Sequence, residues 1–168
     1  MSQPAVRNRP EVPGRMSTRH GEDLYTWVQE QVALLRAGRL GEIDAENIAE
    51  ELSDVGKSEF SKLQSALEII LAHMLKWDHQ PERRSRSWDN SIAAQRADYA
   101  DVLGDNPGLK SRRSEALTRA YRKARLAASS ETNPPRDSFP AECPYGWDDV
   151  LERPFTYEAP VASGGKHC

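Results

Sequence analysis

The chain has 168 residues, of which 29% are charged and 38% are hydrophobic, and its net charge is −3. This length fits one domain with tails, and the near-neutral charge gives the whole chain no nucleic-acid signature. Cys143 and Cys168 form no CxxC or Cys/His pattern, which argues against a disulfide framework and a metal site and favours a reducing compartment. Because no run approaches the ~18 apolar residues of a membrane span, we expect a cytoplasmic protein that binds no membrane.

Charge is distributed unevenly along the chain. Residues 20–72 hold eleven acidic and four basic side chains, whereas residues 73–126 hold twelve basic and seven acidic ones. Opposite charges on successive segments suit helices that pair with each other, but a basic segment also suits a negatively charged partner. We expect pairing within the molecule to be the main use of these charges, with a binding face as the open alternative.

Both ends of the sequence predict segments outside the core. Residues 1–20 are rich in Pro and Arg and predict a disordered basic arm, and residues 158–168 predict a flexible tail. The first sixteen residues contain no apolar run, so they do not predict a secretory signal. A single domain is therefore predicted over residues 21–157.

Capping residues and helical periodicity predict the first two helices. Acidic residues suit the first turn of a helix over residues 22–37, which Gly38 ends. Asp44 suits the cap of a second helix that runs to about Trp77. Its apolar residues recur at helical spacing: Ile48, Leu52, Val55, Leu63, Leu67, Ile70, Met74 and Trp77. Gly56 interrupts this pattern, so one long helix and two shorter helices both remain open.

Two further helices follow the corner at Pro81, which ends the second helix. Ser87 is predicted to cap the third helix, which carries apolar residues on one face. Pro107 suits the first position of a fourth helix. That helix has a face of small residues from Ala116 to Ala128, which would let a neighbouring helix come close.

The remaining segment is irregular and rich in proline. Phe139, Tyr145 and Trp147 are expected to pin it onto the helices, and a short helix fits residues 147–152. No alternating apolar strand pattern occurs. The sequence therefore predicts an all-α fold, an antiparallel bundle of four to five helices with an irregular Pro-rich C-terminal segment.

Several stretches carry a resemblance to a known family. They include "LYTWVQEQVALLRAGRLGEIDAENIAEELSDVGKSE", "LAHMLKWDHQPERRSRSW", "IAAQRADY", "DNPGL", "AYRKARLAA" and "FPAECPY". On these stretches the chain resembles the bacterial family catalogued as domain of unknown function twenty-nine. Gly108 replaces the serine usual in the "NPSL" turn of that family. The resemblance implies an all-helical fold and implies no activity.

The stretch "HMLKWDHQPERRSRSW", from His73 to Trp88, is the richest in side chains that carry chemistry. His73 lies among apolar residues, where burial would keep its imidazole neutral. A neutral histidine near Arg84 or Arg96 could cleave a phosphodiester, because guanidinium groups stabilise developing charge on phosphate. These three residues are the catalytic candidates of a metal-independent nuclease, although a lone histidine among apolar residues more often has a structural role.

Metal and cofactor chemistry have little support in this stretch. His73 and His79 are six residues apart, which places them about 120° apart around a helix rather than on one face. No metal site and no cofactor are predicted. The interpretation that we favour is a structural corner, in which Trp77 and Trp88 cover the end of the bundle. Arg84 or Arg86 would then reach back to Glu50, to Glu51 or to a backbone carbonyl.

We expect a protein-interaction or regulatory module rather than an enzyme, with a protein partner or a homo-oligomer. A homodimer would use the small-residue face of the fourth helix. The alternatives are nucleic-acid binding through the basic segment 83–125 and the nuclease. The candidate binding residues are Trp77, Gln80, Arg83, Arg84, Arg86, Trp88, Gln95 and Arg96.

Overall fold

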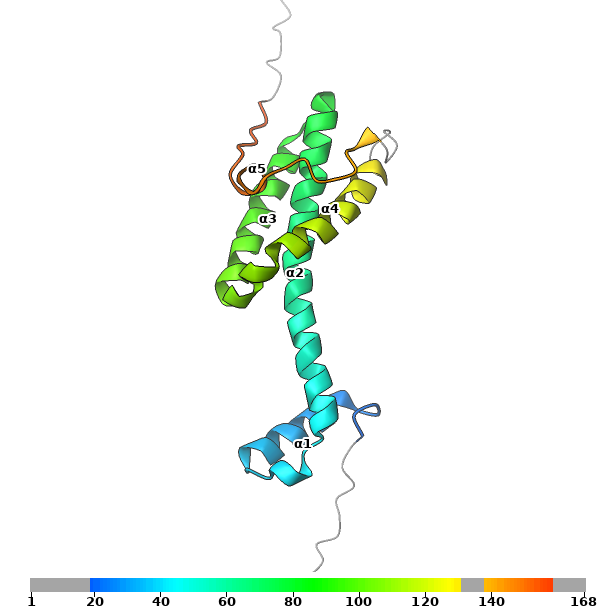
Figure 1. The fold of residues 1–168 in the computed structure, drawn as a ribbon, viewed down its shortest axis with the longest axis vertical. Helices are drawn as coiled ribbons and strands as arrows, with labels where there is room; N and C mark the ends of the chain where they lie inside the picture. The colour runs from blue at the N-terminus through cyan, green and yellow to red at the C-terminus, as the bar shows by residue number, and fades with distance from the viewer. Residues whose placement is uncertain (1–18, 131–137, 159–168) are drawn as a thin grey trace, which may run out of the picture. The chain divides into compact units, whose positions relative to one another are not determined.

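The computed structural model describes residues 19–130 and 138–158 (Figure 1). These residues form five α-helices and no strand, so the predicted all-α fold is confirmed. The helices are α1 (Leu24–Arg36), α2 (Ala45–His79), α3 (Arg86–Asp105), α4 (Arg113–Ser130) and α5 (Trp147–Leu151). Contacts group the chain into a first unit that ends at Ser53 and a second unit that begins at Asp54. The single domain over residues 21–157 stays a prediction.

Helix α1 begins and ends through local contacts that the sequence anticipates within two residues. Asp23 is the N-cap, and its carboxylate accepts hydrogen bonds from the backbone N–H of Thr26 at 3.1 Å and from its hydroxyl at 2.6 Å. Gly38 follows the helix with φ of 69°, a backbone conformation that glycine adopts without strain. The N–H of Gly38 donates to Leu35 and that of Arg39 donates to Leu34, which is a Schellman motif.

The interior of the first unit is built from polar contacts around one indole. Trp27 is buried, and the His20 ring lies edge-on to it at 4.7 Å between centroids. His20 Nε2 lies 2.6 Å from Glu51 Oε1. The buried Gln31 accepts a hydrogen bond from the backbone N–H of Asp44 at 2.8 Å. His20 was predicted to lie in the disordered arm but packs into this unit, and residues 1–18 of that arm lie outside the described residues.

Helix α2 is one continuous helix of 35 residues, so the alternative of a break at Gly56 is excluded. Asp44 caps it as predicted, accepting a hydrogen bond from the Asn47 backbone at 3.3 Å. The predicted apolar stripe divides in two. Leu52 and Val55 are exposed, whereas the stripe from Leu63 onward is buried, including Leu63, Leu67, Ile70, Met74 and Trp77.

Helix α3 returns antiparallel to α2 in the second unit. Lys76 Nζ of α2 lies 5.1 Å from the centre of the Trp88 ring, near the start of α3. At the other end of α3, the Asn106 amide donates to Glu59 of α2 at 3.2 Å. The cap of α3 is Ser85, two residues earlier than predicted.

Helix α4 then packs against α2 and α3, completing a three-helix arrangement within the second unit (Figure 1). Pro107 begins a short 3-10 helix, η3 (Pro107–Arg112), rather than α4 itself. Further short 3-10 helices span Leu40–Glu42 and Pro81–Arg83.

The small-residue face of α4 lies in the core. Ala116, Ala120, Ala124 and Ala128 are fully buried within the same core cluster as the apolar residues of α2. Small side chains let two helices approach closely, and here they do so within the chain. The predicted route to a homodimer through this face is therefore wrong, because α4 already uses the face internally.

The irregular C-terminal segment is pinned to the helices as expected. Phe139 is buried and its ring lies edge-on to His79 at 5.0 Å. Tyr121 of α4 donates a hydrogen bond to the Pro140 carbonyl at 2.8 Å, and Arg125 donates to the Phe139 carbonyl at 3.0 Å. The predicted short helix is present as α5, one residue shorter than expected.

None of the helices among the described residues is both long enough and apolar enough to cross a membrane. Helix α2 has the length, but charged residues run through it.

Two glycines allow a matched test of the backbone assignments. A methyl group at Gly56 would meet no atom within 4 Å, and alanine stabilises an exposed helix interior relative to glycine. We expect Gly56→Ala to raise the free energy of unfolding by about 0.5–1 kcal/mol in urea denaturation. Gly38→Ala should lower it by about 1 kcal/mol, because alanine is strained at positive φ although space is free. A destabilised Gly56→Ala protein would contradict the continuous helix.

Candidate interaction surfaces

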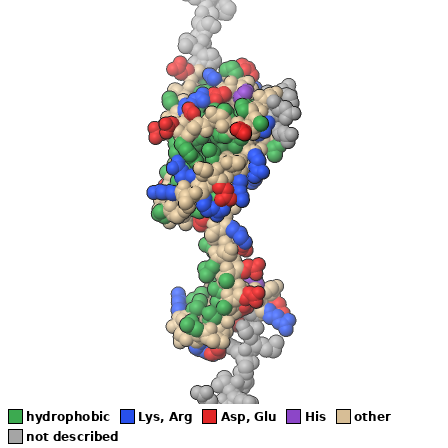
Figure 2. Space-filling view, viewed as in Figure 1, with side chains coloured by type: hydrophobic (Ala, Val, Ile, Leu, Met, Phe, Trp, Pro, Cys, Tyr) green, Lys and Arg blue, Asp and Glu red, His purple; other side chains and the backbone are tan. Residues whose placement is uncertain are grey.

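Large apolar side chains are exposed on the first unit. We call this set the N-terminal apolar surface, and its members are Leu24, Tyr25, Leu35, Leu40 and Leu52. Their exposed fractions lie between 43% and 76%. Figure 2 shows hydrophobic side chains gathered over α1. Exposed apolar patches larger than a few hundred Å² are rare on monomeric proteins, so this surface is a candidate interaction site.

The first unit has too small an interior to cover these side chains itself. Among its described residues, Trp27 and Gln31 are the buried ones. A unit of this size rarely gains enough from burial to offset the conformational entropy that its chain loses on folding. Covering the N-terminal apolar surface with a partner would supply the missing burial.

The first unit, which carries this surface, is rich in acidic residues. Residues 19–53 hold eight acidic and three basic side chains. Hydrogen bonds from Asn47 and Trp27 and the nearby His20 lower the pKa of Asp44, and the Thr26 hydrogen bonds lower that of Asp23. Both groups therefore stay ionised at neutral pH, and the unit offers an apolar surface in a negative field.

The corner after α2 contains the predicted contact between Arg84 and a backbone carbonyl. Trp77 is buried, and its ring lies edge-on to Phe155 at 5.4 Å. Arg84 donates its Nε–H to the Trp77 carbonyl at 2.9 Å, and its guanidinium lies 5.2 Å from the centre of the indole. Of the predicted acceptors, the structure uses a backbone carbonyl. Glu51 is engaged with His20 instead.

A shallow hollow of about 420 Å³ opens beside this corner. It is lined by Trp77, Pro81, Glu82, Arg84, Thr156, Tyr157 and Glu158. Gln80, next to Pro81, is 4% exposed, and its Nε2 has no hydrogen-bond partner among the described residues. Its Oε1 accepts a hydrogen bond from Arg83 at 3.3 Å. A buried donor without a partner costs free energy, so Gln80 does not stabilise the corner through its amide nitrogen.

An ion pair closes the other side of the corner. Arg153 donates to both oxygens of Asp78, at 2.5 and 2.9 Å, and Tyr145 donates its hydroxyl to Asp78 at 2.9 Å. Burial raises the pKa of Asp78, but the hydrogen bonds from Arg153 and Tyr145 outweigh burial, and the pKa lies below its ordinary value. Burial and the Asp78 carboxylate raise the pKa of Tyr145, which therefore stays a donor.

The three catalytic candidates each have a different local contact. His73 is half-buried rather than in the core, and its Nδ1 lies 2.8 Å from the Ile69 carbonyl, so Nδ1 carries the proton. Arg84 holds the Trp77 carbonyl, and Arg96 holds the carbonyls of residues 149 and 150 in α5 at 3.1 and 2.8 Å. Both guanidinium groups therefore bind backbone, and this geometry does not support the predicted nuclease centre.

The other binding candidates lie along α3 and the corner. Trp88 is half-buried under the Lys76 ammonium. Gln95 donates to Asp98 at 2.7 Å, and Arg86 is exposed at the start of α3. Like the catalytic candidates, they stay predictions, because no ligand identifies a site among them.

The two flanks of α2 in the second unit differ in charge. The lining of a hollow of about 390 Å³ between α2 and α3 includes four acidic residues, Glu59, Asp98, Asp101 and Asp105, and one basic residue, Lys62. Within residues 19–130 and 138–158, no group of three or more His, Cys, Asp or Glu side chains has the arrangement of a metal site. Along α4 the charge is reversed. A hollow of about 530 Å³ is lined by Arg119, Arg122 and Lys123, with Leu126 of α4 and Ser61 and Gln64 of α2.

The basic segment 83–125 is thus divided between two uses. Arg113 donates to the Tyr99 hydroxyl at 2.5 Å and lies 4.1 Å from the centre of the Trp147 ring. Arg96 and Arg125 hold carbonyls of the C-terminal segment. Lys123 pairs with Glu68 of α2 at 3.6 Å, which is the pairing of acidic and basic helices that the sequence predicts. Most arginines here bind carbonyls and rings, a use that charge patterning did not predict.

Comparison with known proteins identifies the family. The family model described as domain of unknown function DUF29 matches residues 20–156. The chain belongs to this family. The match begins at His20 and extends almost to the end of the described residues, so it includes both units. No curated protein and no solved structure shows a significant match to the chain.

Membership of DUF29 assigns no chemistry to these surfaces, so their contacts must be read from the structure. Some of the residues that make these contacts could not be recognised from sequence patterns. Gln31 and His20 are polar residues in a unit where periodicity directs attention to Leu and Val. Arg153 lies 75 positions from its partner Asp78. Local spacing cannot predict a pair of residues so far apart in the sequence. The charge of Asp78 does not help either, because any of the many basic residues could be its partner.

The Asp78 cluster predicts a dependence of stability on pH. Because the folded-state pKa lies below the ordinary value of 3.8, the stability that Asp78 contributes is fully present above that value. It is lost as pH falls through the folded-state pKa. We therefore expect the stability difference between the native protein and Asp78→Asn, measured by urea denaturation, to be constant from pH 7 to about 5 and to shrink below about pH 4.

Arg153→Met serves as the control for that experiment, because it removes the main partner and keeps the carboxyl group. Its stability should change less between pH 5 and pH 3 than that of the native protein. A difference between the native protein and Asp78→Asn that stays constant down to pH 2 would contradict the assignment.

Gln80 and Gln31 form a second matched pair, because both are buried and differ in their hydrogen bonds. Gln80→Met removes an amide nitrogen without a partner, so we expect the free energy of unfolding to stay the same or rise by about 1 kcal/mol. Gln31→Met leaves the Asp44 N–H without its acceptor and should cost about 1–3 kcal/mol. Thermal melts followed by circular dichroism would measure both, and a cost above about 1 kcal/mol for Gln80→Met would contradict its lack of a partner.

Proposed function

We propose that this DUF29 protein is a protein-interaction module whose first unit binds an amphipathic helix of another protein. The observation that carries the proposal is the N-terminal apolar surface, exposed on a unit that buries two of its described side chains. The proposal includes a bacterial, cytoplasmic protein, where Cys143 and Cys168 would stay reduced.

The arrangement of the apolar residues supports a helical partner. Leu24 and Leu35 are eleven residues apart on α1, which places them within about 20° of each other around the helix axis. Val28 lies between them on the same side, and Leu52 adds an exposed side chain from the start of α2. A stripe of this spacing accepts the apolar face of a further helix, as in helix-in-groove recognition.

The charge of the unit supports a basic partner rather than a second copy. Two copies brought together through this surface would each contribute the same excess of acidic side chains. Like charges across an interface raise its free energy, whereas opposite charges speed association and fix its register. We therefore expect basic residues to flank the apolar face of the partner helix.

The test uses a triple variant, Leu24→Gln, Leu35→Gln and Leu52→Gln, as bait beside the native chain. Exposed substitutions change stability little, so the variant should fold. A protein captured by the native chain is purified and titrated against both chains by calorimetry, and we expect the variant to bind at least about tenfold more weakly.

Leu126→Gln is the matched control, because Leu126 is as exposed as these leucines but lies on α4 of the second unit. It should bind like the native chain. Equal binding by the triple variant would refute the proposal. So would a dimer of the native chain, seen in sedimentation velocity, that dissociates in the triple variant, since that result would assign the surface to a second copy.

A further inference from the structure

The hollow between α2 and α4 combines positive charge with neutral hydrogen-bond donors, and we refer to it as the basic groove. Arg119, Arg122 and Lys123 line it from one turn of α4. Ser61 and Gln64 line it from α2, offering a hydroxyl and an amide. These are the groups that hold phosphate oxygens in proteins, because guanidinium binds an oxyanion with two parallel hydrogen bonds and the neutral donors complete its coordination.

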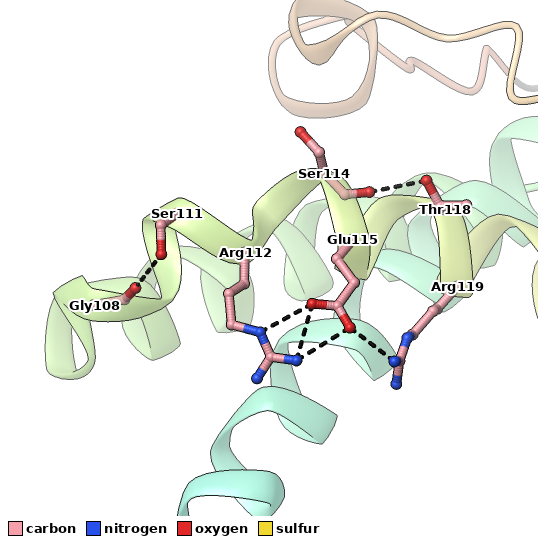
Figure 3. A network of polar contacts seen from close by, with 7 residues as sticks. All are labelled: Gly108, Ser111, Arg112, Ser114, Glu115, Thr118 and Arg119. Atoms are coloured by element: carbon pink, nitrogen blue, oxygen red, sulfur yellow. Dashed lines mark hydrogen bonds and ion pairs between the residues drawn. The ribbon is translucent and has the colours of Figure 1, made fainter.

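Neighbouring carboxylates neutralise part of the charge and leave the rest. Glu115 is shared: it accepts from Arg112 at 3.0 and 3.1 Å and pairs with Arg119 at 2.8 Å. Figure 3 shows this carboxylate held between the two guanidinium groups. Glu68 pairs with Lys123 at 3.6 Å. These three cations and Arg122 therefore face two carboxylates, and the groove keeps an excess of positive charge in a chain whose net charge is negative.

The guanidinium of Arg119 is held in place before any ligand arrives. Glu115 holds one side of it, and the group lies 5.6 Å from the centre of the buried Phe60 ring, over which Arg112 also lies at 3.9 Å. A guanidinium fixed by an aromatic ring and a carboxylate loses less conformational entropy on binding than a free side chain does. Arg119 is still 50% exposed and accessible to a ligand.

Because the groove is open to solvent, it suits a ligand with several linked phosphates better than a single phosphate ion. Arg119 and Lys123 are half-exposed, so one phosphate bound here would keep most of its water and be screened by salt. Appreciable affinity therefore requires several phosphates of one ligand to contact the groove together. Arg119 and Lys123 lie one helical turn apart, about 6 Å along α4, which spreads the positive charge along the groove.

We propose that the basic groove binds the phosphodiester backbone of single-stranded nucleic acid. Proteins that bind single strands without sequence preference use a positively charged groove that follows the backbone, and this hollow of about 530 Å³ places three cations along one turn of α4. No aromatic side chain lines the groove, so bases have no stacking platform there. Binding should therefore tolerate any sequence and depend strongly on salt. This site is independent of the N-terminal apolar surface, because it lies wholly within the second unit.

The experiment measures binding of fluorescein-labelled oligothymidylate of about 20 nucleotides by fluorescence anisotropy, at several salt concentrations. The groove variant is Arg119→Gln, Arg122→Gln and Lys123→Gln. The matched control is Arg36→Gln, Lys57→Gln and Lys110→Gln, which removes the same charge from exposed residues outside the groove. Circular dichroism confirms that both variants are folded.

We expect the native chain to bind with log K falling against log salt with a slope of roughly −2, as for three phosphates of a single strand. The groove variant should bind at least about tenfold more weakly and lose most of that slope. The control should stay within about threefold of the native chain, since distant charges act weakly through salt.

Three results would overturn the proposal. One is the absence of binding at low salt. Another is an equal loss of affinity in the control variant, which would make the interaction a general charge effect. The third is that polyglutamate of matched charge, or a duplex of the same sequence, displaces the labelled strand more effectively than unlabelled oligothymidylate does. If polyglutamate displaces the labelled strand more effectively, the ligand of the groove is an acidic protein segment rather than a nucleic acid.

Discussion

Burial of one face of α2 is the constraint on which the second unit depends. Leu63, Leu67, Ile70 and Met74 have no exposed surface, and α3, α4 and the C-terminal segment all contribute to the core around them. Removing this apolar surface from water supplies the dominant favourable term in folding. The same periodic stripe continues into the first unit, but there Leu52 is exposed. One sequence pattern therefore builds a core in one part of the helix and leaves apolar side chains exposed in the other.

Local signals in the sequence predicted the helices well. Asp44, Gly38 and Pro81 start or stop helices where capping rules place them, and the all-α fold follows from periodicity. Burial was harder to predict, because helical spacing says which residues share a face and not whether another element covers it. That is why Leu52 falls in the predicted apolar stripe although it is exposed, and why the alanines of α4 were assigned to a dimer interface although α4 buries them within the chain.

The candidate sites show the same limit. The sequence located the basic segment and the corner around Trp77, but it could not divide the arginines among their partners. Carbonyl acceptors occur at every residue, so side-chain patterns contain no record of which carbonyl an arginine will reach. Once the arginines that bind carbonyls and rings are set aside, the basic groove on α4 remains positively charged. The first unit carries an excess of acidic residues, so the two units present surfaces of opposite charge. The two proposals together predict a module that holds a protein and a nucleic-acid strand at the same time.

The arginine contacts also affect how the family can vary. Arg96 holds the carbonyls of residues 149 and 150, Arg125 holds that of Phe139, and Tyr121 holds that of Pro140. A mutation in this segment changes a side chain and leaves the carbonyl that accepts the bond. The segment can therefore drift in composition while its attachment persists, so long as the two arginines and the tyrosine are kept. Divergent members of the family should retain the hydrogen-bond donors Arg96, Tyr121 and Arg125 on α3 and α4. Their sequences can differ freely along much of the C-terminal segment that these donors hold.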